Sequence, residues 1–266
     1  MPALTLADGH VLTYAETGSG PHLVLVHGSP GEGRAWNRVA PLLADRFHVL
    51  TPDLPGYGRS SPLAGAAAGT AAMAEGITRL IESLDGPILL GGHSYGGNVA
   101  LHVMARAPGR IQALALLEPV FFRALELNGD DAPLDEAGRY FSAYAARAAA
   151  EERDAIIDMV DYWFGRGAFD QLPPPVQGFL RTAAPRNAVD VKASFAEPLP
   201  KAALADFDRP AFIAHGSASA PVAVAIARAL GGLLPMADVV SIAGASHGMI
   251  DTHPGEVAHL IAGLAA

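Results

Sequence analysis

A single serine lies between glycines in the stretch GGHSYGG, residues 91–97. The apolar run ILL precedes this stretch, and the helical run NVALHVMA follows it. A serine at a sharp turn from a strand into a helix adopts an unusual backbone conformation, which only very small neighbours tolerate. Gly92 and Gly96 stand two residues before and after Ser94, so the pattern predicts a nucleophilic Ser94 whose Oγ lies at the positive end of a helix. A glycine-rich loop with an idle serine is the alternative.

A serine hydroxyl attacks a carbonyl only when a neighbouring imidazole takes its proton. The chain has ten histidines. Five of them lie in an N-terminal hairpin, at the starts of predicted strands or inside predicted helices: His10, His22, His48, His102 and His259. His93 flanks the serine, but we expect its side chain to point away from Oγ. His247 follows the last predicted strand in a glycine-flanked loop that can fold back over Ser94, and we expect it to be the base. His215 and His253 are the alternatives.

Four segments in chain order resemble the α/β-hydrolase superfamily, and the resemblance covers nearly the full length. VHGSPGEGRAW resembles the loop that supplies the oxyanion hole, and LTPDLPGYGRS resembles the segment after the fourth strand. GGHSYGG is similar to the turn that carries the nucleophile, and GASHGMIDTHP to the loop that carries the catalytic histidine. The resemblance therefore implies an α/β-hydrolase fold, and it selects the same residue, His247. The stretch DYWFGRGAF is also similar to the cap of a bacterial subgroup of these hydrolases.

The carboxylate that orients the histidine is where this sequence departs from the superfamily. Most members carry an aspartate shortly after the seventh strand, but here the loop reads HGSASAPV and Ser219 occupies that place. Glu118 offers a replacement, and some members place their acid at this position. It ends the strand next to the strand of the nucleophile, about 4.8 Å away, and can reach behind His247. The alternative is that Glu118 caps a helix or forms a salt bridge at a domain junction.

The negative oxygen of a tetrahedral intermediate needs fixed hydrogen-bond donors. We expect the first donor to be the backbone N–H of Tyr95, directly after the serine, and the second to be the N–H of Ser29 in the segment HGSPG. Aromatic residues beyond residue 120 predict a mostly apolar pocket, and Phe121, Phe122 and Trp163 are the candidates for substrate-lining side chains. Because aromatic side chains at helical spacing also form cores, core packing is the alternative for each of them.

The alternation of strands and helices predicts an α/β fold with a doubly wound, mostly parallel sheet. An N-terminal stretch of alternating apolar and polar residues predicts a β-hairpin that turns at Asp8-Gly9. Short, continuously apolar runs predict strands that are buried on both faces: residues 22–28, 47–53, 87–94, 111–119, 210–216 and 238–244. Helical runs separate them: residues 35–45, 71–85, 96–108, 220–232 and 253–265. Connections of this kind are right-handed crossovers within one sheet.

One interval breaks the alternation. Residues 120–205 contain no strand of this type and are rich in alanine, charged residues and aromatics. We therefore expect a helical cap at residues 120–205 over the carboxyl ends of the strands, and an α/β-hydrolase core formed by residues 1–119 and 206–266. An interaction module unrelated to the site is the alternative interpretation of this insertion.

The composition excludes several classes of protein. Charged residues make up 17% and hydrophobic residues 50% of the 266 residues, and the net charge is −9 without a basic block, which argues against disorder and nucleic-acid binding. No cysteine is present, which excludes disulfides and thiolate metal sites, and no HExxH-like cluster indicates a metal. No secretory signal and no run long enough to span a bilayer is visible. We expect a cytoplasmic protein without a cofactor.

These observations predict a serine hydrolase that cleaves an acyl bond through a Ser94–His247–Glu118 triad and an acyl-enzyme intermediate. A carboxylic ester in a small molecule is the expected substrate, ahead of a lactone, a thioester, an amide or an activated C–C bond. A cofactor-free perhydrolase, a C–C hydrolase or an aminopeptidase variant is an alternative within the superfamily. A catalytically silent receptor or scaffold is the alternative outside catalysis, and the missing aspartate at Ser219 supports it. The sequence leaves a homodimer open.

Overall fold

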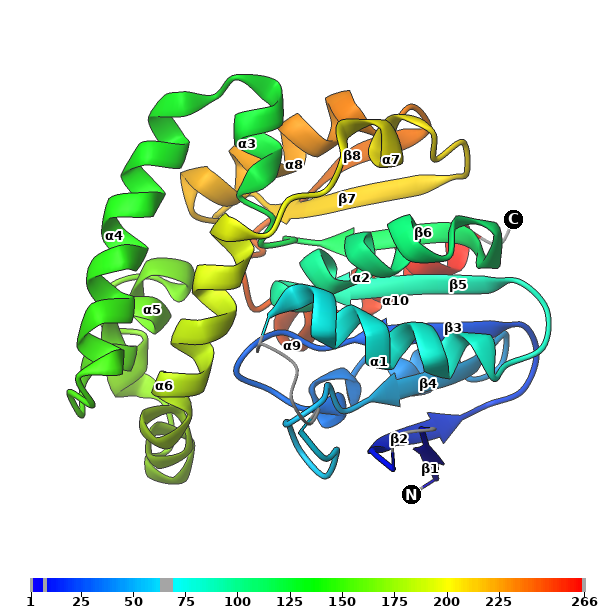
Figure 1. Cartoon of the computed structure of the whole chain (residues 1–266), viewed down its shortest axis with the longest axis horizontal. Coiled ribbons are helices and arrows are strands. Elements are labelled where there is room, and N and C mark those ends of the chain that lie inside the picture. Colours follow the sequence, from blue (N-terminus) through cyan, green and yellow to red (C-terminus); the bar gives the residue numbers. More distant parts are fainter. Residues whose placement is uncertain (1, 7–8, 63–68, 265–266) are drawn as a thin grey trace.

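The computed structural model describes residues 2–6, 9–62 and 69–264, and in this part the chain forms an eight-stranded sheet with helices on both faces (Figure 1). The strand order is β1-β2-β4-β3-β5-β6-β7-β8. β2 pairs antiparallel with both β1 and β4, whereas the other neighbours are parallel. The predicted doubly wound, mostly parallel sheet is therefore confirmed.

The strands coincide with the predicted apolar runs. Their bounds are Ala3–Thr5 (β1), Val11–Thr17 (β2), His22–Val26 (β3), His48–Pro52 (β4), Ile88–His93 (β5), Ile111–Leu117 (β6), Ala211–Gly216 (β7) and Ala237–Ile242 (β8). Val24 and Leu90 pack with α1 and α2 on one face, while Leu23 and Leu89 pack in a second buried cluster on the other face. Because both faces are covered, the inner strands β3 to β7 need continuous rather than alternating apolar residues. The expectation that the strand at residues 238–244 is buried on both faces is wrong, because β8 is an edge strand and most of its residues are exposed or half-buried. Asp8, part of the predicted hairpin turn, lies outside the described residues.

Helices cover the sheet at most of the predicted places. Their bounds are Thr70–Glu82 (α1), Tyr95–Arg106 (α2), Pro221–Leu233 (α8), Met249–Thr252 (α9) and Pro254–Gly263 (α10). The prediction of a helix at residues 35–45 is wrong, because this stretch forms two short 3-10 turns, Gly33–Trp36 and Ala40–Leu42. Pro41 has no backbone N–H to donate and its ring crowds the preceding turn, which disfavours a continuous α-helix there.

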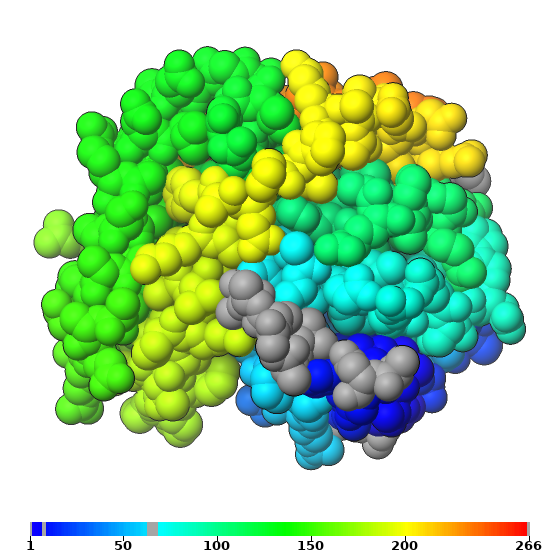
Figure 2. Space-filling view, in the orientation of Figure 1, coloured from blue at the N-terminus to red at the C-terminus, as the bar shows by residue number. Residues whose placement is uncertain are grey.

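The segment between β6 and β7 is helical. Its helices are Arg123–Asn128 (α3), Asp131–Ala149 (α4), Ala155–Phe164 (α5), Pro174–Ala196 (α6) and Lys201–Ala205 (α7). In Figure 1, α4, α5 and α6 lie beyond one end of the strands, and Figure 2 shows α4 and α6 closing that end of the molecule. Residues of α3 and α6 share one buried cluster with α1 and α2, so the division at residues 119 and 206 stays a prediction. No helix in the described ranges has the length and apolar character needed to cross a membrane.

Buried histidines link the stability of this fold to pH. His27, His93 and His102 are all buried. Burial lowers the pKa of His27 to about 4, that of His93 to about 3 and that of His102 to about 4. In an unfolded chain each imidazole titrates near pH 6.5. Between pH 6.5 and 4 the unfolded chain therefore binds more protons than the folded one, and the free energy of unfolding falls as the pH falls.

The variant His102→Leu tests this link. His102 lies in α2 and its Nε2 has no hydrogen-bond partner, so the substitution removes a titrating group without breaking a bond. We expect the loss of unfolding free energy between pH 7 and pH 5 to be about 2 kcal/mol smaller in the variant than in the wild-type protein. Urea unfolding at the two pH values measures it, with His259→Leu on the exposed side of α10 as the control. If the unfolding free energy falls equally in His102→Leu and in the wild-type protein, His102 does not contribute to the pH dependence of stability.

Candidate active site

Ser94 occupies a tight turn between β5 and α2. Its φ of 56° and ψ of −126° lie in a region that residues other than glycine rarely adopt. A Cβ on Gly92 would overlap the carbonyl oxygen of Gly96, and a Cβ on Gly96 would overlap the end of β3. A Cβ on Gly97 would lie 2.7 Å from that of Pro119, so this glycine lets α2 approach the end of β6. The three glycines therefore permit the turn and set its position against the sheet.

The structure brings Ser94, His247 and Glu118 into one hydrogen-bonded chain. Ser94 Oγ lies 2.9 Å from His247 Nε2, and His247 Nδ1 lies 2.7 Å from Glu118 Oε2. Since a carboxylate only accepts, Nδ1 carries the proton and Nε2 accepts the hydrogen bond from the serine hydroxyl. Both His247 and Glu118 are almost completely buried. This arrangement can move a proton from Ser94 to His247 while the carboxylate stabilises the imidazolium.

Glu118 is held in place by the loop in which the superfamily's aspartate is missing. Its Oε1 accepts hydrogen bonds from the Gly216 N–H, at 2.9 Å, and from the Ser219 hydroxyl. Burial by itself raises the pKa of Glu118, but the hydrogen bonds from His247, Ser219 and Gly216 outweigh it and hold this pKa below its usual value. Ser219 therefore contacts the carboxylate directly.

Backbone hydrogen bonds tie the turns at Ser94 and Glu118 to each other. The Ser94 N–H donates to the Leu117 carbonyl at 3.0 Å, and the Val120 N–H donates to the Ser94 carbonyl at 3.0 Å. The Glu118 N–H donates to Ala214 of β7 at 2.8 Å. Because β5, β6 and β7 are parallel neighbours, their carboxyl ends lie at one edge of the sheet, and the two side chains leave the sheet side by side.

The segments that carry the predicted oxyanion donors lie next to the serine. Gly28 packs so closely that a Cβ there would lie 3.0 Å from Ser94 Cβ and 3.4 Å from Ser94 Oγ. Within the described ranges, neither the N–H of Ser29 nor that of Tyr95 donates to a backbone carbonyl. Unpaired N–H groups beside Oγ can bind a developing negative oxygen. Their part in catalysis stays a prediction.

Two buried imidazoles fix the loops around the site. His93 Nε2–H donates to the His247 carbonyl at 2.7 Å, so the residue before the serine anchors the histidine loop. His27, which the sequence reasoning did not assign, accepts from the Leu54 N–H at 2.9 Å through Nε2 and donates to the Gly28 carbonyl at 2.7 Å through Nδ1. Both rings can donate and accept because their low pKa values keep them neutral. His27 stands directly before Gly28 in the HGSPG segment, and this position was the sequence feature from which its role could have been inferred.

The alternative histidines make other contacts. His215, at the end of β7, bonds through Nδ1 to the carbonyl of Gly216 at 3.0 Å, and His253 begins α10 and bonds to the neighbouring threonine at 2.8 Å. No three His, Asp or Glu side chains within the described residues form a group that could hold a metal ion.

Ser94 and His247 open into a cavity of about 720 Å³. Trp163 lines this cavity, and its contact with a substrate stays a prediction. Further apolar side chains from α5, α6 and the connection between them complete the wall: Met159, Val160, Phe164, Leu172, Val176, Phe179, Leu180 and Val191. The helices between β6 and β7 therefore provide most of the apolar surface that a ligand would meet.

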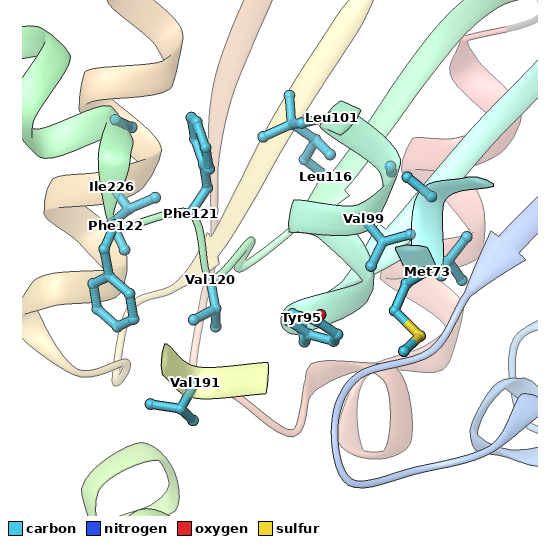
Figure 3. Packing of buried hydrophobic residues seen from close by; sticks show 14 of the residues in the cluster. Met73, Tyr95, Val99, Leu101, Leu116, Val120, Phe121, Phe122, Val191 and Ile226 are labelled. Atoms are coloured by element: carbon cyan, nitrogen blue, oxygen red, sulfur yellow. The ribbon is translucent and has the colours of Figure 1, made fainter. Parts of the chain in front are cut away.

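The expectation that Phe121 and Phe122 line this cavity is wrong. Neither is among its lining residues, and both are completely buried in the cluster that includes Val120 and Ile226 (Figure 3). The Phe122 ring stacks on that of Phe195, with centroids 3.8 Å apart. Both rings are thus used as core, because a fully buried phenyl ring gains more from close packing than from a cavity wall.

Trp163 also covers the imidazole. Its ring stacks on that of His247 with centroids 4.6 Å apart and planes at 22°, and Phe164 meets the same imidazole edge-on at 5.4 Å. Trp163 in turn packs on Phe141, with centroids 5.6 Å apart. The indole and the phenyl ring thereby help to bury the imidazole, which is 3% exposed.

The sequence and the structure are similar to those of known hydrolases and related enzymes. The sequence model of the alpha/beta hydrolase family matches residues 23–260. The lipase LipV of Mycobacterium tuberculosis is 40% identical over 125 residues, which are 47% of this chain but only 45% of the lipase. A non-heme chloroperoxidase of Streptomyces lividans is 30% identical over 96% of this chain and 95% of its own length. A solved thermophilic esterase from Thermogutta terrifontis superposes with a TM-score of 0.75, at 25% identity, over 98% of this chain and 96% of the esterase.

The turn at Ser94 gives a stability test. In Gly92→Ala the new Cβ would overlap the backbone of Gly96, so we expect the free energy of unfolding to fall by about 3 kcal/mol. Gly109→Ala is the matched control, because nothing lies within 4 Å of a Cβ there, and we expect it to change stability by less than about 0.5 kcal/mol. Urea unfolding of the two variants measures both. A Gly92→Ala protein as stable as the control would show that the turn differs from the one described.

Proposed function

The chain belongs to the alpha/beta hydrolase family, and on this premise we propose that it is a serine hydrolase that cleaves a carboxylic ester. The observation that carries the proposal is the chain of hydrogen bonds from Ser94 Oγ through His247 to Glu118, with bonds of 2.9 and 2.7 Å. A serine, an imidazole and a carboxylate in this order are the groups that acyl transfer needs. Lipase and esterase relatives support an ester as the substrate.

The proposed reaction has two halves. Ser94 Oγ attacks the acyl carbonyl while its proton passes to His247 Nε2, and Glu118 stabilises the imidazolium through Nδ1. The N–H groups of Tyr95 and Ser29 hold the oxyanion, and the alcohol leaves with the proton of His247. Water then attacks the acyl-enzyme with His247 as the base, which releases the acid and restores Ser94.

The cavity supports an ester with a bulky apolar group. Its walls are mostly aliphatic and aromatic, and its polar lining residues include Ser29, Asn187 and Asp190. Phe164 and Phe179 also belong to the lining although they are 46% and 48% exposed. Exposed apolar side chains at the edge of a cavity are typical of a site that binds an apolar ligand. We therefore propose a small-molecule acyl substrate whose chain lies between α5 and α6.

Reaction with a fluorophosphonate probe tests the proposed nucleophile. We expect wild-type protein to be labelled at Ser94, as peptide mass spectrometry can establish, and Ser94→Ala to stay unlabelled. We expect Glu118→Gln to fold normally and to lower kcat for a p-nitrophenyl ester by about 10⁴-fold, because the imidazole loses its charged partner. A wild-type protein that resists the probe would favour the catalytically silent receptor instead.

The contact between Ser219 and Glu118 permits a rescue experiment. Because the Ser219 hydroxyl reaches Glu118 Oε1, an aspartate at this position would bring a carboxylate into the same pocket. We expect Ser219→Asp, introduced into the Glu118→Gln variant, to raise kcat at least tenfold above that of Glu118→Gln alone. Ser217→Asp is the matched control, since Ser217 Oγ bonds to Gly244 N–H at 2.8 Å on the exposed side of the same loop. Equal recovery with both aspartates would contradict the assignment of Glu118.

A substitution in α6 tests the place of the acyl chain. Val191 lines the cavity, so Val191→Phe should fill part of it and lower kcat/KM for p-nitrophenyl octanoate at least tenfold more than for p-nitrophenyl acetate. Val189→Phe is the control, because Val189 is 36% exposed on the same helix and is not part of the lining. If Val191→Phe lowers both activities equally, the acyl chain does not occupy this part of the cavity.

A further inference from the structure

Helix α6 presents polar side chains where an apolar face is expected. Asn187, Asp190 and Ser194 follow one another at helical spacing, and all three are at most 2% exposed. They belong to the cavity lining, beside Ser29 and Tyr95. A helix that covers a core normally buries apolar residues, so this face needs an explanation other than core packing.

The polar face of α6 binds Ser29 from two residues. Ser29 Oγ–H donates to Asp190 Oδ2 at 2.7 Å. Asn187 Nδ2 donates both to the Ser29 carbonyl and to Ser29 Oγ, at 3.0 Å each. Tyr144 OH donates to Asn187 Oδ1 at 2.6 Å, which fixes the orientation of the amide. The side chain and the carbonyl of Ser29 are therefore both held by α6, whereas its N–H is left open.

The buried carboxyl group of Asp190 lowers stability more than a contact that only attaches α6 to the core would need to. The carboxyl group is 1% exposed, and burial raises its pKa above the usual range. Its nearest cation is the Arg186 guanidinium, whose Nε lies 3.7 Å from Oδ1, and Oδ1 accepts no hydrogen bond within the described residues. The short contact from Tyr57 OH and the bond from Ser29 both reach Oδ2. A buried carboxyl group with one oxygen that accepts no hydrogen bond costs stability, so its placement against Ser29 points to a role there.

We propose that Asp190 is a positioning residue that acts through Ser29 on the oxyanion hole. This inference rests on the proposed function, because it requires the Ser29 N–H to bind the oxyanion. Gly28 and Gly31 flank the segment and carry no side chains, so within it only the ring of Pro30 restrains the backbone around Ser29. The three hydrogen bonds between Ser29 and α6 add a restraint from outside the segment. An oxyanion donor that is lost costs about 10²- to 10³-fold in kcat, and a donor that is misplaced costs a part of this.

The carboxylate at the end of α6 provides a matched comparison. Glu197 accepts hydrogen bonds from the N–H groups of Thr70 and Ala71 at 2.9 and 2.7 Å, and thereby joins the end of α6 to the start of α1. Glu197 does not belong to the cavity lining. A substitution at Glu197 therefore weakens the attachment of α6 to the core without touching Ser29.

A double-mutant cycle tests the proposal. The variants are Asp190→Asn, Ser29→Ala, the double variant and Glu197→Gln. The readouts are the second-order rate of fluorophosphonate labelling, kcat and KM for a p-nitrophenyl ester, and the thermal midpoint. We expect Asp190→Asn and Ser29→Ala each to lower the labelling rate and kcat 10- to 100-fold with KM changed less than threefold. The double variant should be no slower than the slower single variant, because both remove the same link.

The outcomes separate the possible errors. Glu197→Gln should lower the thermal midpoint but keep the wild-type labelling rate, as a purely structural contact would. Wild-type labelling rates in Ser29→Ala or Asp190→Asn would overturn the positioning role and leave the serine hydrolase intact. Multiplicative losses in the double variant would also overturn it. If Asp190→Asn fails to fold, the labelling rate and kcat of Ser29→Ala alone decide whether the positioning role holds. A wild-type protein that is not labelled at all would overturn the proposed function, and this inference with it.

Discussion

Two turns with positive φ at neighbouring strand ends are the constraint on which the site depends. Ser94 has a φ of 56° and Glu118 a φ of 44°, and the backbone bonds between them prevent either turn from relaxing alone. A left-handed backbone costs an L-residue about 1–2 kcal/mol, which the parallel register of β5, β6 and β7 must offset. Because both turns lie at the same edge, one imidazole from a distant loop can contact the two side chains at once.

The two buried carboxyl groups, Glu118 and Asp190, have different hydrogen-bond partners and opposite pKa shifts. Glu118 receives hydrogen bonds from His247, Ser219 and the Gly216 N–H, and its pKa is held below the usual value. Asp190 receives its bonds on one oxygen only, and burial raises its pKa. The first environment stabilises a permanent negative charge beside an imidazole. The second binds hydroxyl groups next to the cavity.

Contacts from the segment between β6 and β7 complete the site from the side opposite to the sheet. Trp163 of α5 covers the His247 ring, and Asp190 of α6 binds Ser29. The groups that the sheet positions and those that the helices add therefore meet around one cavity. A movement of α5 or α6 would change the surroundings of the imidazole and of the Ser29 segment together.

Regular elements and local motifs were predictable because their signals are local. Continuous apolar runs identified the strands of the parallel sheet, and the glycines around Ser94 indicated the turn. The helix expected at residues 35–45 was wrong, since Pro41 interrupts a pattern that otherwise has helical spacing. Phe121 was expected near a ligand because it follows the end of β6, but its ring joins the core. Position along the chain did not reveal which way that side chain points.

The sequence by itself determined where the hydroxyl, imidazole and carboxyl side chains stand along the chain and which strand ends they follow. The sequence favoured Glu118 as the acid, but only the tertiary structure brings it to His247, because the two residues are 129 positions apart along the chain and strand pairing sets where Glu118 lies. The same holds for Asp190, which contacts Ser29 across 161 residues of chain. Spacing along a sequence encodes strands, helices and turns, whereas contacts of this length arise only when the packed layers bring the segments together.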